Sequence, residues 1–332
     1  MKKLLDPDLD LEPLRDRTVA VVGFGNQGHA HALNLRDSGI RVAVGARPGG
    51  AGWTDAEAAG FRPQPVEDAV RGADIAMLLL PDEVQPRVYR TQIEPRLRQG
   101  ALLAFGHGFA LRFRTLEPRP DLDVGLVAPV GPGHLLRSRF AEGGGIPVVI
   151  AVDQDRSGRS WDLVRAYAKA LGGGRAGVLE TTVADECETD LFGEQAVIVG
   201  GVAALMEAGF DTLRNAGYPE ELAYFECVHQ MKLLVDLVHE HGIAGMRDRI
   251  SRTALFGDLT RGRRVIGPES RRAMQEILAE IRDGRFAEEW VHAKAEAWKA
   301  PLERARTHPL ERVGAELRAA ARGAGDAGPE TD

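Results

Sequence analysis

The sequence predicts an α/β fold in which an N-terminal Rossmann-like domain with a parallel sheet precedes an all-α C-terminal domain. Three observations predict it. Short apolar runs alternate with helical stretches in the first half, a glycine-rich turn joins a strand to a helix, and no convincing strand follows residue 186. Repeated strand–helix–strand units favour a parallel sheet with helices on both faces.

Six apolar runs are predicted to form the sheet. They are rich in Val, Leu, Ile and Ala, as is typical of strands that are buried on both faces. The runs are residues 18–23, 41–45, 74–80, 100–105, 123–128 and 147–152. Helices are expected between most of them, for example over residues 26–38 and 83–98.

The second half has the pattern of helices. Leu222, Phe225 and Val228 recur at helical spacing. We expect about six helices here, with breaks at residues 217–219, Gly242, Gly257, residues 267–268 and Pro301. The predicted domains are a Rossmann-like domain over residues 1–182, a helical domain over 183–321 and a disordered tail over 322–332.

Composition agrees with two soluble domains and excludes several classes of protein. A chain of 332 residues suggests two domains, and its 44% apolar and 27% charged content excludes a disordered or collagen-like chain. The net charge of -7 gives no basic field for nucleic acid or an anionic membrane. We therefore expect neither as a partner.

Cysteine usage and apolar runs predict a cytoplasmic protein. Cys187 and Cys227 are too few for a disulfide framework. The apolar run over residues 196–206 is shorter than the ~20 residues that span a bilayer, and residues 1–10 lack a signal-peptide core. Six lysines against 36 arginines indicate a GC-rich, bacterial genome.

The turn Gly23-Phe24-Gly25-Asn26-Gln27-Gly28 predicts a dinucleotide site, because it follows a strand and opens a helix. Gly23 allows the tight turn, Gly25 lets the backbone approach a pyrophosphate, and Gly28 lets the helix pack on the strand. The helix N-terminus adds free amides for the phosphates. The alternative is a tight turn that binds no ligand.

The choice between NADPH and NADH stays open at this point. No Asp or Glu ends the second strand, where NAD-specific sites usually bind the ribose hydroxyls. Arg47 at that place is able to face a 2′-phosphate or to stack on the adenine. Thr54 is the nearest hydroxyl that would assist Arg47.

Two pairs of polar residues at helical spacing suggest a metal site. Asp190 and Glu194 are four residues apart, and Glu226 and Gln230 repeat that spacing. Hard oxygen ligands that converge from two helices suit Mg²⁺. Acids at this spacing are also common on solvated helix faces, which is the alternative interpretation.

Together these segments resemble the ketol-acid reductoisomerases of branched-chain amino-acid biosynthesis, in their short form. Residues 24–36 (FGNQGHAHALNLR) and 188–195 (ETDLFGEQ) are highly specific matches. The resemblance implies binding of Mg²⁺ at two sites and of NAD(P)H, alkyl migration in a 2-acetolactate-type substrate, and reduction of the resulting 2-keto acid. It also implies a knotted helical domain and a homodimer that shares its active sites between subunits.

The resemblance implies a role for each matching residue. Asp190 would bridge the two metal ions, Glu194 would complete the first metal site, and Glu226 would bind the second metal ion. Together with His107 near the nicotinamide, these acids form the expected catalytic set. Ser251, Gln230 and Pro132 are expected at the substrate, and Pro81, Gly133 and Arg47 at the cofactor along with residues 23–28.

Two departures from the family pattern concern the chemistry. The family loop places a lysine where this chain has Val130, and valine offers neither a donor nor a charge. Gln230 replaces a glutamate and loses the negative charge that would anchor a second cation. Arg252 and Leu255 also depart from the pattern. Members of such a constellation act as a unit, so the loss of one usually costs orders of magnitude in rate.

Hydride transfer depends less on the missing groups than alkyl migration does. The sequence therefore predicts a reductase for a C=O or C=N group, in specialised metabolism, with isomerisation lost or weakened. An imine would suit it, because a cationic carbon accepts hydride without a metal. One alternative is a true ketol-acid reductoisomerase with Gln230 as a neutral ligand. The other is a non-catalytic nucleotide-binding or scaffold protein.

Overall fold

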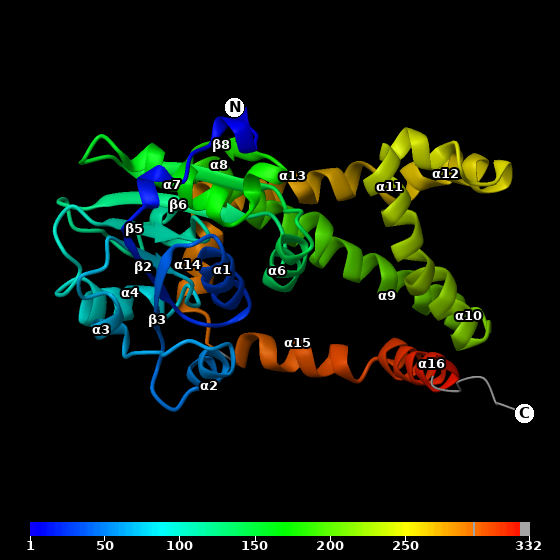
Figure 1. Cartoon of the computed structure of the whole chain (residues 1–332). Helices are drawn as coiled ribbons and strands as arrows, with labels where there is room; N and C mark the ends of the chain where they lie inside the picture. Colours follow the sequence, from blue (N-terminus) through cyan, green and yellow to red (C-terminus); the bar gives the residue numbers. More distant parts are fainter. Residues whose placement is uncertain (295, 326–332) are drawn as a thin grey trace, which may run out of the picture. The chain divides into compact units, whose positions relative to one another are not determined.

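The protein is described by a computed structural model that covers residues 1–294 and 296–325 (Figure 1). The chain forms two compact units that divide between Thr189 and Asp190, inside a helix. The first unit holds the sheet and its helices. The described residues of the second unit form helices that are joined by short loops.

The first unit is built on an eight-stranded mixed sheet with the order β1-β8-β7-β6-β5-β4-β2-β3. The strands are β1 Lys2–Leu4, β2 Thr18–Val22, β3 Arg41–Gly45, β4 Ile75–Leu78, β5 Leu102–Phe105, β6 Asp123–Pro129, β7 Val148–Gln154 and β8 Val178–Glu180. Strands β3, β2, β4, β5 and β6 are parallel, as predicted. Successive residues of β2 enter two cores, one on each face, with Val19 and Val21 opposite Ala20 and Val22.

The prediction of a parallel arrangement was wrong for β7, which pairs antiparallel with β6. Strand β7 begins next to the residue at which β6 ends, so the segment between them leaves and re-enters the sheet at the same end of the strands. There the Val130 N–H donates to the Pro147 carbonyl at 2.8 Å. The sequence also missed β1 and β8. Each has three residues, fewer than the four to eight that make a strand pattern recognisable.

Seven short helices cover the sheet in the first unit. They are α1 Asn26–Asp37, α2 Ala51–Ala58, α3 Val66–Ala69, α4 Gln85–Val88, α5 Phe109–Arg112, α6 Gly133–Ala141 and α7 Ser160–Ala170. The helix expected over residues 83–98 is confined to α4 and a π turn, Tyr89–Ile93. It stops there because Pro95 has no N–H to continue the ladder.

The described part of the second unit contains more helices than the six expected. They are α8 Val183–Gly193 (which starts in the first unit), α9 Gly200–Asn215, α10 Glu220–Tyr224, α11 Gln230–Arg247, α12 Arg252–Val265, α13 Pro268–Asp283, α14 Arg285–His292, α15 Glu296–Arg306 and α16 Pro309–Gly325. Breaks occur near residues 217–219 and 267–268, and Gly242 kinks α11 with φ 71°.

Two expected breaks were wrong. Gly257 lies inside α12 and Pro301 inside α15. Glycine weakens a helix without removing a hydrogen bond, and proline removes only one. Residues 322–325 continue α16, and residues 326–332 of the predicted tail lie outside the described residues.

The second unit buries few of its apolar side chains. Its core cluster consists of Phe210, Ala223, Tyr224, Leu310 and Val313. Exposed apolar side chains are frequent on α9, α11 and α12, and they include Leu205, Leu233, Ile243, Phe256 and Leu259. Across the described residues, the helix over Val183–Asn215 is the one whose length and apolar composition suffice to cross a membrane.

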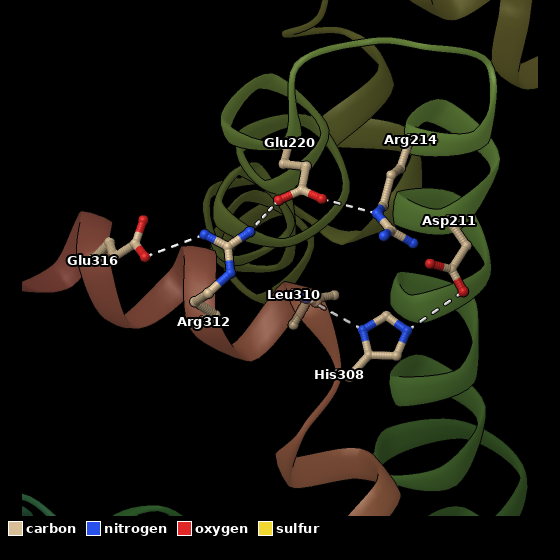
Figure 2. Close-up of polar contacts among 7 residues, drawn as sticks. All are labelled: Asp211, Arg214, Glu220, His308, Leu310, Arg312 and Glu316. Atoms are coloured by element: carbon tan, nitrogen blue, oxygen red, sulfur yellow. Dashed lines mark hydrogen bonds and ion pairs between the residues drawn. The ribbon is translucent and has the colours of Figure 1, made fainter.

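Polar contacts attach α16 to α9 and α10 (Figure 2). The Nδ1 atom of His308 accepts from the Leu310 N–H at 3.3 Å, and Nε2 lies 3.4 Å from Asp211. A chain of ion pairs then runs through Arg214, Glu220, Arg312 and Glu316. These contacts surround the core cluster, to which α16 contributes Leu310 and Val313.

Candidate functional site

The predicted dinucleotide turn lies at the point where the strand order reverses. Strand β2 has β3 on one side and β4 on the other, so the chain changes direction across the sheet at this place. Ligands of open α/β sheets bind in the crevice outside the carboxyl ends of the strands at such a switch point. The turns after β2 and β4 meet here: a Cβ placed on Gly23 would lie 2.5 Å from the Leu79 carbonyl oxygen.

The glycines of the turn have the geometry that a pyrophosphate requires. Gly23 has φ +97°, which favours glycine, and a Cβ on Gly28 would lie 2.0 Å from the Gly23 carbonyl oxygen. A Cβ on Gly25 would meet no atom within 4 Å, so its face of the turn is open. A close turn with one open glycine, at the start of α1, fits a dinucleotide phosphate.

The start of α6 lies against the start of α1. A Cβ on Gly133 would lie 2.0 Å from the Asn26 carbonyl oxygen, and the His134 N–H donates to Asn26 Oδ1 at 3.1 Å. The Gln27 side chain donates to the Gly131 carbonyl at 2.9 Å. A cleft of about 680 Å³ opens beside this junction. The structure thus brings Gly133 together with the predicted dinucleotide turn, and Pro132 is the N-cap of α6.

The loop after β3 contains no acid that could bind ribose hydroxyls. Arg47 is exposed, and its side chain folds over its own loop: a Cβ on Gly50 would lie 3.3 Å from Arg47 Nε. Thr54 is also exposed. The role of Arg47 toward the cofactor stays a prediction.

His107 lies in the turn after β5 and contacts α8. Its Nδ1 atom is 3.2 Å from Glu186 Oε1, and the Gly108 N–H donates to Glu186 Oε2 at 2.9 Å. Glu186 is buried, so one carboxylate holds the turn from both sides. Sequence reasoning missed Glu186. The available signal was its spacing, since Glu186, Asp190 and Glu194 follow one another every four residues.

The surroundings of His107 favour its charged form. Burial alone would lower the pKa of His107, but hydrogen bonds to Cys187 and Glu186 raise it to about 11. Burial raises the pKa of the neighbouring Cys187 thiol. These contacts favour the imidazolium form of His107, which is able to stabilise negative charge on a bound group.

The predicted metal ligands do not form a metal site within one chain. Asp190, Glu194, Glu226 and Gln230 are all exposed. Over residues 1–294 and 296–325, no group of three or more His, Cys, Asp or Glu side chains is arranged to hold a metal ion. Carboxylate oxygens suit Mg²⁺ chemically, but the described residues of a single chain do not supply its coordination sphere.

Both helices that carry these acids contain a π turn. Glu194 begins the π turn Glu194–Ile198, and Glu226 lies inside the π turn Phe225–His229, which ends just before Gln230. A π turn inserts an extra residue into the helical register and is frequent at functional sites. The sequence suggested that Glu226 and Gln230 are one regular α-helical turn apart. The π turn between them makes their spacing different from that.

Two positions that the sequence singled out for the substrate region have defined local structure. Val130 follows β6 at the carboxyl end of that strand and is 58% exposed, so the loop presents an apolar side chain at the position where the resemblance predicts lysine. Ser251 is the N-cap of α12, and its Oγ accepts from the Ala254 N–H at 3.1 Å. Its hydroxyl hydrogen is still able to donate to a ligand.

Two family models match almost the whole chain. The acetohydroxy acid isomeroreductase NADPH-binding domain matches residues 13–177, and the ketol-acid reductoisomerase C-terminal domain matches residues 183–322.

Solved structures agree with these matches. An NADH-preferring ketol-acid reductoisomerase from an uncultured archaeon is 44% identical, with 96% of this chain and 99% of that chain covered and a TM-score of 0.93. A semialdehyde dehydrogenase NAD-binding protein from Cupriavidus necator is 21% identical, with coverage of 81% and 99% and a TM-score of 0.61. A 1-pyrroline-5-carboxylate reductase from Streptococcus pyogenes is 15% identical, with coverage of 80% and 98% and a TM-score of 0.51. The last two show a shared fold only.

Proposed function

The chain belongs to the ketol-acid reductoisomerase family, whose members are NAD(P)H-dependent oxidoreductases, and from this premise we propose that it is a reductase in which isomerisation is lost or weakened. Its substrate would be a small molecule with a C=O or C=N group, in specialised metabolism. The observation that carries the proposal is that the sequence has uncharged residues at positions 130 and 230, whereas the glycines of the dinucleotide turn keep their geometry.

Reduction depends little on the lysine and the glutamate that are absent at positions 130 and 230. When bound, the nicotinamide supplies the hydride. The turn at residues 23–28 would hold its pyrophosphate, and the carbon of the substrate would accept the hydride. The oxygen or nitrogen that gains the electron pair would take a proton from the His107 imidazolium, which Glu186 holds in place. An iminium substrate needs even less assistance, because its carbon is already cationic.

Alkyl migration asks for more. A carbon–carbon bond shifts while an alkoxide is stabilised, which in metal enzymes depends on a well-anchored cation. Asp190, Glu194 and Glu226 would hold Mg²⁺, whose contribution is to polarise the substrate oxygen. The uncharged Gln230 provides one anionic ligand fewer, and Val130 provides no donor.

We further propose that the protein is a cytoplasmic homodimer whose subunits share active sites. One chain does not assemble the carboxylates, and the described part of the helical unit leaves Leu233, Phe256 and Leu259 about half exposed or more. Apolar patches of this kind mark protein interfaces in soluble proteins. A second copy would supply both the missing ligands and the cover.

A second candidate function is a true ketol-acid reductoisomerase that uses Gln230 as a neutral ligand. The observation that favours it is the 44% identity to such an enzyme over 96% of this chain. That relative is NADH-preferring, and the loop after β3 has glycines at 49 and 50 beside Arg47, with no acid and no hydroxyl before Thr54. Both candidates therefore need to be assayed with NADH and with NADPH.

The test offers the purified protein two substrates, with each cofactor and with or without Mg²⁺. 2-Acetolactate requires migration and reduction, whereas 3-hydroxy-3-methyl-2-oxobutanoate requires reduction only. We expect turnover of the second substrate or of a cyclic imine, and little turnover of 2-acetolactate. Efficient conversion of 2-acetolactate would support the second candidate instead.

A further inference from the structure

We propose that the turn between α12 and α13 is a docking surface for an acidic segment of another protein. The turn lies in residues 261–272 of the helical unit, which we call the basic turn. It contains none of the residues that the sequence assigned to the active site, so the docking is separate from the proposed reduction. Its five arginines are all exposed: Arg261, Arg263, Arg264, Arg271 and Arg272.

Two helix ends meet at the basic turn. Helix α12 ends at Val265, and α13 begins at Pro268. The Ser270 hydroxyl donates to the Val265 carbonyl at 3.1 Å, and a Cβ on Gly267 would lie 3.7 Å from the Arg264 carbonyl oxygen. The short link therefore gathers arginines from the end of one helix and the start of the next around a single tight turn.

The arginines of the basic turn lack the partners that other arginines of this unit have. Arg214, Arg247 and Arg312 each pair with an acid. Within the part of the chain that the structure describes, no arginine side chain of the basic turn forms an ion pair or a hydrogen bond. Five arginines and Glu269 give the basic turn a net charge of +4, whereas the other residues carry -11, which gives the whole chain -7. The basic turn is thus a local positive surface on an acidic protein.

Folding alone does not favour this arrangement. Arg263 and Arg264 suit the C-terminus of α12, where the helix dipole favours cations. Arg271, in contrast, follows the first turn of α13, near a helix N-terminus that disfavours cations. Arg261 and Arg264 lie three residues apart on α12, a spacing at which like charges repel. An anionic partner would relieve both effects.

The partner has to match apolar side chains as well as charge. Val265 is 60% exposed and Ile266 is 41% exposed, and both lie between the two groups of arginines. Arginines beside apolar side chains are typical of protein–protein interfaces. A protein segment with acidic and apolar residues would bind the arginines through charge-assisted hydrogen bonds and would cover Val265 and Ile266.

Nucleic acid fits the basic turn less well. Its phosphates would bind the arginines, but its backbone offers no apolar surface to Val265 and Ile266. Its long row of negative charges would also meet the -11 charge that the rest of the chain carries, and like charges repel. A protein segment is able to contact the basic turn alone, so the observations favour an acidic protein partner.

The experiment measures binding to three labelled probes by fluorescence anisotropy, with the full chain in its own oligomeric state. The probes are a peptide of glutamate and leucine, the same peptide with glutamine for glutamate, and a DNA duplex. The test variant is Arg271→Glu, and Arg271→Lys keeps the charge. The matched control is Arg156→Glu, which makes the same change in charge at an exposed arginine of the first unit. Thermal midpoints and sedimentation are recorded for each protein.

We expect the wild type to bind the glutamate peptide at least about tenfold more tightly than the glutamine peptide, and less tightly as salt screens the charges. Arg271→Glu weakens binding of the glutamate peptide about tenfold, because one attraction becomes a repulsion. The same variant unfolds at a higher temperature, since a carboxylate suits the start of α13. Arg271→Lys keeps most of the affinity, and Arg156→Glu keeps all of it.

Several outcomes would overturn the proposal. Equal affinity of the wild type for the two peptides, or unchanged peptide affinity in Arg271→Glu, removes the docking surface. Tighter binding of the DNA duplex than of the glutamate peptide assigns the basic turn to nucleic acid instead. A shift of Arg271→Glu toward monomer assigns it to a contact between copies of this chain, and a lower thermal midpoint assigns Arg271 to the fold. None of these readouts depends on cofactor or substrate, so the proposed reduction is tested separately.

Discussion

Gly28 is needed for the fold of the turn, whereas Gly25 is needed for cofactor binding alone. Alanine substitutions should distinguish these two roles. A Cβ on Gly28 would overlap the Gly23 carbonyl, so Gly28→Ala should lower the thermal midpoint and abolish cofactor binding together. Gly25 has φ -90° and no atom near the place of a Cβ, so the variant Gly25→Ala should fold normally. It should nevertheless bind NAD(P)H at least about tenfold more weakly, because the added methyl group would occupy the place of the phosphate. Thermal denaturation and cofactor titration check both. Normal binding by Gly25→Ala would contradict the dinucleotide assignment.

The pair of His107 and Glu186 predicts a pH dependence with a definite sign. The folded state raises the pKa of His107 from 6.5 to about 11, so it binds more protons than the unfolded state between these values. The stability contributed by the pair is therefore full below about pH 6.5 and is lost as the pH rises toward about 11.

The variant Glu186→Gln tests this pair. It should lower the pKa of His107, as followed by NMR titration of the imidazole, and move the alkaline loss of reductase activity toward neutral pH. An unchanged imidazole titration in Glu186→Gln would contradict the account.

Residues are predictable from sequence where a motif fixes them and unpredictable where only packing does. The turn at residues 23–28 was identified because its glycine spacing, between a strand and a helix, is typical of dinucleotide-binding turns. Glu186 was missed, since its partner Gly108 becomes its neighbour only when the loop after β5 is placed. Spacing along the chain does not encode such contacts.

At the scale of elements, the second unit combines a small core with a polar rim, and the two should differ in their effect on stability. Phe210 is fully buried in the core cluster, so Phe210→Ala should lower the free energy of unfolding by about 3–5 kcal/mol. Arg312 contacts Glu220 and Glu316 at the exposed rim, so Arg312→Ala should change the unfolding midpoint only slightly (Figure 2). Urea unfolding of both variants provides the comparison. A larger loss of stability in Arg312→Ala than in Phe210→Ala would mean that the ion pairs, and not the core cluster, contribute most to the stability of the second unit.

The elements also show why sequence patterns describe some segments better than others. Strands β2 to β6 were found because each is a run of apolar residues with buried faces. The direction of β7 was missed, because it depends on where the chain re-enters the sheet after α6. The π turns at Glu194 and Glu226 were missed as well, since hydrophobic spacing predicts helix without specifying its register.

At the scale of the whole molecule, the exposed apolar helices predict a dimer. Phe256 and Leu259 on α12 are each more than half exposed. We expect the wild type to sediment as a dimer, Phe256→Glu and Leu259→Glu to shift it toward monomer, and reductase activity to fall with the dimer fraction. The control is Leu5→Glu, an exposed apolar position in the first unit that should change neither property. A fully active monomer would contradict the shared site.

We attribute the proposed loss of isomerisation to the uncharged residues Val130 and Gln230. The most direct test is the ratio of kcat/KM for 2-acetolactate to that for 3-hydroxy-3-methyl-2-oxobutanoate, in the wild type and in the double variant Val130→Lys/Gln230→Glu. We predict a low ratio in the wild type and a rise of at least about 100-fold in the double variant, since members of such a site act as a unit. A wild-type ratio near unity that the double variant leaves unchanged would contradict the claim.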